Sequence, residues 1–176
     1  MLGFALLGVG RIGIMHANNI ALNPKCNLEI VYDVNAKASK DVAKIHNCQV
    51  AKSAEEAVSN PKVDVVYITS ATPTHVEFIL LAAQANKAIF CEKPIDLDIN
   101  KVDQCRAELK KYNVLLHIGF NRRFDLSHKS AKKAKDNGEI GNLEMIIITS
   151  RDPKPSAIDY LKTSGGIFKD MTIHDF

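Results

Sequence analysis

Three glycines near the start of the chain are spaced as in sites that bind a pyrophosphate. Residues 8–13 read GVGRIG, which directly follows an apolar run of strand length and opens a helical segment. In such a turn the first glycine permits a tight bend, the second lets the backbone approach the pyrophosphate, and the third allows close helix–strand packing. Free N–H groups and the helix dipole would favour the anion there. The residues predicted to bind the cofactor at this turn are Gly8, Gly10, Arg11, Ile12 and Gly13.

A carboxylate closes the second apolar run. Asp33 lies about 20 residues beyond Gly13, where an acidic residue accepts hydrogen bonds from the adenosine ribose of a dinucleotide. A carboxylate at this position also repels a 2′-phosphate, which favours NAD over NADP. Lys37 is close enough in the sequence to compensate such a phosphate, so NADP remains an alternative.

Apolar runs of strand length alternate with helix-length amphipathic segments as far as residue 120. We expect strands at 4–7, 28–32, 50–51, 64–69, 88–91 and 114–119. The helices are expected at 12–21, 35–46, 74–86 and 98–112, with a brief one after a capping box at Ser53. Strands that are apolar on both faces indicate a parallel sheet covered on both sides. We therefore predict an α/β fold, a doubly wound Rossmann domain over residues 1–120.

The regular alternation of strands and helices ends after residue 120. We expect a helix at 126–137, a strand at 143–150, a proline-containing loop at 152–155 and a helix that starts near Ser164. These elements predict the start of a second domain over residues 121–176.

Composition excludes several classes of protein. Lys+Arg 23 against Asp+Glu 20 gives a net charge of +3, too small to indicate a nucleic-acid or membrane-surface protein. The basic residues at 128–135 have no interleaved aromatic rings for base stacking and predict a solvated helix face. No apolar run approaches the roughly 18 residues of a membrane span. The four cysteines form no CxxC pair, so we predict no metal site, and free thiols favour a cytoplasmic protein.

Three of the expected strands are followed by segments whose polar side chains could take part in binding or catalysis. Residues 70–75 read SATPTH, residues 92–94 read EKP, and residues 119–124 read GFNRRF. With the glycine turn they resemble the glucose–fructose oxidoreductase/inositol dehydrogenase (Gfo/Idh/MocA) family, of which EKP at this position is the most particular motif. The closing residues 164–176, SGGIFKDMTIHDF, resemble the inositol dehydrogenase branch of that family.

The resemblance implies roles for individual residues. Lys93 matches the family's catalytic lysine, Asp170 its carboxylate and His174 its general base, and the bond between Lys93 and Pro94 is often cis in the family. The residues implied to line the cofactor are Thr72, Pro73, His75, Glu92 and Lys93. The residues expected to bind the substrate are Asn121, Arg123, Arg151 and Asp152.

The residue types suit oxidation of a secondary alcohol. A hydride moves to the nicotinamide while a base takes the hydroxyl proton, and histidine suits that task because it titrates near neutral pH. Asp170 and His174 are four residues apart, so on one helix they would share a face. Lys93 would supply positive charge where alkoxide character develops.

The resemblance implies a substrate and a domain plan. It implies NAD-dependent oxidation of a cyclic polyol, myo-inositol to its 2-keto form, with dehydrogenation of another sugar as the alternative. A different alternative is a non-catalytic dinucleotide-binding regulator. Family members run to roughly twice this length and form homo-oligomers, so we expect this chain to be truncated within the α+β substrate and oligomerisation domain. Such a chain could bind NAD without turnover.

Replacing Asp33 tests the cofactor preference. Asp33→Ala should weaken NAD binding more than NADP binding, because only NAD gains from a carboxylate beside both ribose hydroxyls. Calorimetric titration with each cofactor measures the two losses. An equal loss for both would contradict this role of Asp33.

Overall fold

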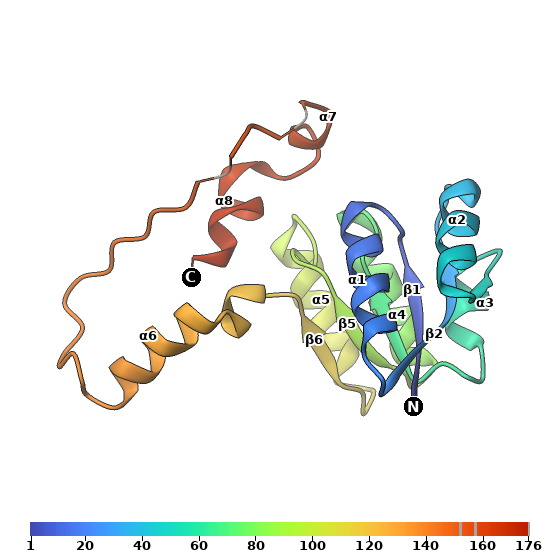
Figure 1. Cartoon of the computed structure of the whole chain (residues 1–176), viewed down its shortest axis with the longest axis horizontal. Coiled ribbons are helices and arrows are strands. Elements are labelled where there is room, and N and C mark those ends of the chain that lie inside the picture. The colour runs from blue at the N-terminus through green and yellow to red at the C-terminus, as the bar shows by residue number, and fades with distance from the viewer. Residues whose placement is uncertain (152, 157, 176) are drawn as a thin grey trace. The chain divides into compact units, whose positions relative to one another are not determined.

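The structure is a computed structural model that describes residues 1–151, 153–156 and 158–175. The chain divides into two compact units, the first covering Met1–Gly119 and the second beginning at Phe120 (Figure 1). Among the described residues, no helix is long and apolar enough to cross a membrane.

One parallel sheet forms the centre of the first unit. Its strands are β1 (Leu2–Leu7), β2 (Cys26–Tyr32), β3 (Gln49–Val50), β4 (Val65–Ile68), β5 (Ala88–Cys91) and β6 (Leu116–Ile118). They lie in the order β3-β2-β1-β4-β5-β6, and every neighbouring pair is parallel. The chain reverses its direction of winding between β1 and β4, where doubly wound sheets bind ligands at the carboxyl ends of the strands. The predicted α/β Rossmann fold is confirmed.

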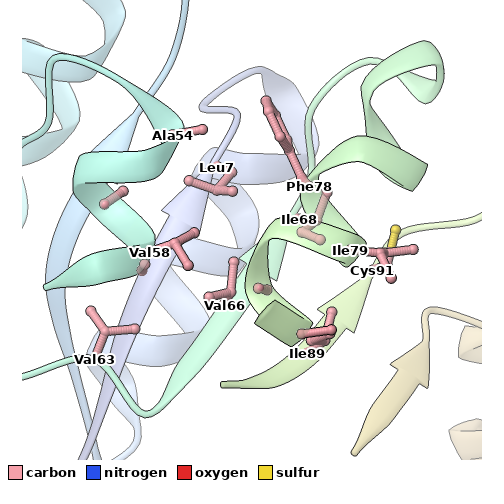
Figure 2. Packing of buried hydrophobic residues seen from close by; sticks show 14 of the residues in the cluster. Leu7, Ala54, Val58, Val63, Val66, Ile68, Phe78, Ile79, Ile89 and Cys91 are labelled. Carbon is pink, nitrogen blue, oxygen red and sulfur yellow. The ribbon is translucent and has the colours of Figure 1, made fainter. Parts of the chain in front are cut away.

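Helices cover both faces of this sheet. They are α1 (Arg11–Leu22), α2 (Ala36–His46), α3 (Ala54–Ser59), α4 (His75–Gln84) and α5 (Ile99–Leu109), with a 3-10 turn η1 (Thr72–Thr74) before α4. Phe4 and Leu6 of β1 pack with α1 and α2, whereas Ala5 and Leu7 pack with α3 and α4. This two-residue alternation is the strand period, and it makes both faces of the central strand apolar. Figure 2 shows the side chains of α3 and α4 gathered over β1, β4 and β5.

Local hydrogen bonds explain where several helices begin. The Ser53 hydroxyl accepts from the Glu56 N–H at 3.2 Å and caps α3, as the capping box predicts. The Glu56 carboxylate reaches back to the Lys52 N–H at 2.7 Å, one residue earlier than in the standard motif. Asp98 caps α5 in the same way by accepting from the Asn100 N–H at 2.9 Å.

The second unit consists of short helices and extended chain. Its helical elements are η2 (Asn121–Phe124), α6 (Leu126–Asp136), α7 (Ile158–Leu161), α8 (Gly166–Asp170) and η3 (Thr172–His174). The strand predicted at 143–150 is wrong, because these residues have no regular secondary structure. A strand is held by hydrogen bonds to a neighbouring strand, and no described residue pairs with this segment. Its apolar side chains are consequently exposed, Ile147 by 83% and Met145 by 76%.

Truncating a core side chain tests the packing of α4. Ile79 on α4 is fully buried, so Ile79→Ala should lower the free energy of unfolding by about 2–5 kcal/mol through lost burial and a cavity. Ile45 on α2 is 73% exposed and provides a matched control, for which we expect a change below about 0.5 kcal/mol. Urea denaturation followed by circular dichroism measures both. Similar losses at the two positions would contradict the core assignment.

Candidate active site at the carboxyl ends of the strands

The turn after β1 is pressed against the end of β4. Gly8 has φ +96°, and a Cβ on it would lie 2.5 Å from the Ser70 backbone, so only glycine fits. The Thr69 hydroxyl donates to the Gly8 carbonyl at 2.6 Å and fixes the turn. Gly13 is equally constrained, since its Cβ would lie 2.1 Å from the Gly8 carbonyl oxygen. These two glycines therefore hold the strand, turn and helix together.

Gly10 has a different environment, one that fits a pyrophosphate. Among the described residues, no atom lies within 4 Å of the position that its Cβ would take. Gly10 is the N-cap of α1, no side chain caps this helix, and no acidic residue occupies its first turn. The positive dipole end of α1 thus lacks a capping side chain among the described residues, with exposed Arg11 beside it and half-buried Ile12 following. The residues present fit the dinucleotide that the glycine pattern predicts.

Asp33 contacts the same turn. Its Oδ2 accepts from the Val9 N–H at 2.7 Å, and its Oδ1 accepts from the Asn35 N–H at 2.8 Å. A carboxylate oxygen has two lone pairs, so both oxygens keep acceptor capacity for ribose hydroxyls. The side chain predicted to read the ribose also organises the backbone around it.

The segment Glu92–Pro94 follows β5, and its Lys93–Pro94 bond is cis. The half-buried Glu92 carboxylate accepts from the Lys93 N–H at 3.2 Å, and its Oε1 lies 2.9 Å from His16 Nε2. Gly119 leaves room for this carboxylate, because a Cβ there would lie 3.1 Å from it. His16 belongs to none of the motifs identified in the sequence, so this contact was not predicted. Its spacing on α1, three residues after buried Gly13 and four before buried Ile20, is the signal that could have indicated it.

Charge and burial act in opposite directions on Glu92. Burial alone would raise the pKa of its carboxyl, but the hydrogen bond and charge interaction with His16, together with Lys93, hold that pKa below its usual range. Burial, with a further contribution from the Glu92 charge, raises the pKa of neighbouring Tyr67 to about 12. The segment before Lys93 therefore carries a negative charge beside a neutral phenol at neutral pH.

The residues after β4 differ in accessibility. Thr72 is half-buried and Pro73 is exposed in η1, so both are accessible to solvent. His75, the first residue of α4, is only 1% exposed. Its Nδ1 lies 2.7 Å from the Pro94 carbonyl and its Nε2 lies 3.0 Å from the Ser70 carbonyl. Its two nitrogens are therefore engaged by backbone rather than open to a cofactor.

The second unit carries the other predicted catalytic residues. Asp170 ends α8 and His174 ends η3, so they do not share one continuous helix as expected. The helix changes from α to 3-10 at Met171, whose N–H still bonds to the Ile167 carbonyl at 3.0 Å. Asp170 Oδ1 accepts from the Tyr160 hydroxyl at 2.7 Å, a partner that the sequence did not suggest.

The predicted substrate residues of this unit are accessible. Asn121 and Arg123 lie in η2 and are exposed, as is Arg151. Asp152 lies outside the described residues. A pocket of about 440 Å³ within this unit is lined in part by Lys154, Ser156, Ser164, Asp170 and Met171. Asp170 thus borders a space with polar groups around it.

A family model decides the relationship. The model of the Gfo/Idh/MocA oxidoreductase family, described by its NAD-binding Rossmann fold, matches residues 2–120. The chain belongs to this family. Its glycine turn and EKP segment are thus placed in an NAD-binding Rossmann fold.

Relatives named as inositol dehydrogenases match nearly all of the chain. The inositol 2-dehydrogenase of Rhizobium meliloti is 47% identical over 174 residues, which are 98% of this chain and 52% of that protein. The myo-inositol 2-dehydrogenase of Thermotoga maritima is 43% identical over 172 residues, which are 97% of this chain and 52% of that protein. The chain therefore spans about half the length of these relatives.

Solved structures agree with this relationship. The crystal structure of a myo-inositol dehydrogenase from Corynebacterium glutamicum has a TM-score of 0.91 and 42% identity, covering 99% of this chain and 53% of that one. The scyllo-inositol dehydrogenase of Lactobacillus casei, solved with NAD(H) and scyllo-inositol, has a TM-score of 0.77 and 31% identity, covering 81% and 43%.

Two glycine substitutions separate folding from cofactor binding. Gly13→Ala places a Cβ against backbone and should destabilise the protein by about 1–3 kcal/mol. Gly10→Ala meets no atom and should change stability by less than about 1 kcal/mol. It should nonetheless weaken NAD binding at least about tenfold, because the methyl group occupies the approach of the pyrophosphate. Thermal unfolding and NAD titration measure the two effects. Unaltered NAD affinity in Gly10→Ala would contradict the assigned cradle.

Proposed function

We propose that this chain supplies the NAD site and part of the substrate site of a dehydrogenase that oxidises a secondary hydroxyl of a cyclic polyol, myo-inositol to its 2-keto form. NAD, when bound, supplies the nicotinamide carbon that accepts the hydride. The observation that carries the proposal is the glycine turn that fits a pyrophosphate, at the same edge of the sheet as Lys93. The relatives named as inositol dehydrogenases support the substrate class.

The first unit would contribute positive charge and cofactor contacts. Lys93 directly follows the Glu92 residue at the end of β5, and β5 is separated from β1 only by β4. Parallel strands end at one edge, so the lysine and the glycine turn share that edge. Lys93 would stabilise negative charge on the substrate oxygen as its proton leaves. Thr72 and Pro73, after the intervening strand β4, would line the cofactor between them.

The second unit would contribute the base and the polyol contacts. His174 would take the hydroxyl proton, and Asp170 would stabilise the resulting imidazolium. Tyr160, which donates to Asp170, would fix the orientation of that carboxylate. The residues proposed to bind the remaining hydroxyl groups of the polyol are Asn121, Arg123, Arg151 and Asp152.

Turnover by variants of the proposed catalytic residues tests this function. We would join the chain to the remaining half of the Rhizobium meliloti relative and follow NADH absorbance with myo-inositol, scyllo-inositol and glucose. Lys93→Ala and His174→Ala should each lower kcat at least about 100-fold, because each removes charge stabilisation or proton transfer from the transition state. The affinity for NAD, measured by calorimetry, should change less than about threefold, since the pyrophosphate and ribose contacts remain.

A matched lysine provides the control. Lys110 is exposed at the end of α5, and Lys110→Ala should leave kcat and NAD affinity unchanged. Undiminished turnover in a variant that lacks both Lys93 and His174 would overturn the mechanism. Tight NAD binding without reduction on any polyol would instead favour a regulatory dinucleotide-binding module.

A further inference from the structure

Two histidines from different helices contact the same three-residue segment. His16 belongs to α1, and its Nε2 lies 2.9 Å from Glu92 Oε1. His75 begins α4, and its Nδ1 lies 2.7 Å from the Pro94 carbonyl oxygen. Glu92 and Pro94 are the two neighbours of Lys93 in the sequence. The lysine is therefore flanked on both sides by residues whose positions a histidine helps to fix.

Burial and aromatic packing fix the position of the His16 ring that contacts Glu92. Only 12% of its side chain is exposed. Its ring centroid lies 4.9 Å from that of Tyr67 and 5.4 Å from that of Phe90, which stack on each other at 4.0 Å. Glu92 in turn accepts from the Lys93 N–H. A rigid aromatic cluster is thus connected through one carboxylate to the backbone of Lys93.

His75 holds the other side of the segment. It is almost completely buried, and both atoms that its nitrogens approach are backbone carbonyl oxygens. A carbonyl oxygen can only accept, and a neutral imidazole carries one N–H, so we assign that proton to Nδ1, which makes the shorter contact. Because Nε2 approaches the Ser70 carbonyl, the same ring spans the loops that follow β4 and β5. Pro94 is therefore tied to the end of the neighbouring strand.

We propose that His16 and His75 are positioning residues that hold Lys93 through its two neighbours in the chain. The role of Lys93 itself rests on the proposed function. Neither histidine needs to touch the substrate, because each acts on the backbone that presents the lysine. Small displacements of a catalytic group lower turnover strongly, so holding this backbone has a direct effect on rate.

Paired substitutions distinguish the hydrogen bond from the packing of the ring. His16→Phe keeps an aromatic ring against Tyr67 and Phe90 but loses the bond to Glu92. His16→Gln loses the ring but can return a nitrogen near the Nε2 position. His75→Phe and His75→Asn make the same comparison, with the asparagine amide near Nδ1. His46→Gln is the control, since His46 lies on α2, which packs against β2 and β3.

The rate at which an amine-reactive reagent labels Lys93 is the first measurement, made on the full 176-residue chain by mass spectrometry with exposed Lys110 as internal reference. Lys93 is half-buried, so releasing its backbone should raise its labelling rate at least about threefold in the two phenylalanine variants. His16→Gln and His75→Asn should raise it less than their phenylalanine counterparts, and His46→Gln should not change it. Equal rates in wild type and both phenylalanine variants would overturn the proposal. Faster labelling in His16→Gln and His75→Asn than in the phenylalanine variants would also overturn the proposal, because ring packing rather than the hydrogen bond would then hold Lys93.

Histidine nitrogen NMR tests the His75 contact without any substitution, and so remains informative if a variant fails to fold. The wild-type chain should show a protonated Nδ1 on His75 at neutral pH. A ring protonated only on Nε2 would overturn this half of the proposal. Neither the labelling rates nor this spectrum requires turnover.

Turnover links the proposal to catalysis. In the fusion that reduces NAD, His16→Phe and His75→Phe should lower kcat by about 10- to 100-fold with little change in the KM for NAD. Unchanged kcat despite faster labelling of Lys93 would overturn the positioning role. A wild-type fusion that reduces no NAD would contradict the proposed function alone, because the labelling and NMR results stand by themselves.

Discussion

The close contact between the turn after β1 and the end of β4 is the constraint on which the first unit depends. Gly8 adopts a positive φ, Ser70 leaves no room for a side chain there, and the Thr69 hydroxyl bonds to the Gly8 carbonyl. The Ser70 carbonyl oxygen also lies 3.0 Å from Nε2 of His75, whose Nδ1 lies 2.7 Å from the Pro94 carbonyl oxygen. A continuous set of contacts therefore connects the glycine turn to the segment that carries Lys93. The position of one is not independent of the position of the other.

The fold of the first unit could be predicted from local sequence because its signals are repetitive and redundant. Runs such as residues 65–68 are apolar on both faces, which is typical of a parallel sheet covered by helices on both sides. The glycine turn then marks where the first strand ends and the first helix begins. The bounds of β3 were predicted less well, because this strand is only two residues long and lies one residue earlier than expected.

Features that depend on a distant partner were the ones that sequence reasoning missed. The pair His16–Glu92 joins residues 76 positions apart, and nothing local to either one indicates the other. The segment 143–150 has the composition of a strand, but composition supplies no neighbour to pair with. Asp170 and His174 have helical spacing, yet α8 ends at Asp170 and a 3-10 turn follows. Local spacing and composition thus indicate which residues suit an element, but they do not supply its neighbours or fix where it ends.

Asp33 carries two tasks that cannot be altered separately. It is the predicted reader of the ribose, and it is also the acceptor for the Val9 and Asn35 N–H groups. A substitution that makes room for a 2′-phosphate would leave both donors without their carboxylate and loosen the turn that holds the pyrophosphate. Exchange of cofactor preference in this fold thus calls for a compensating acceptor at the turn, and a single replacement has a structural cost that selection or design must meet elsewhere.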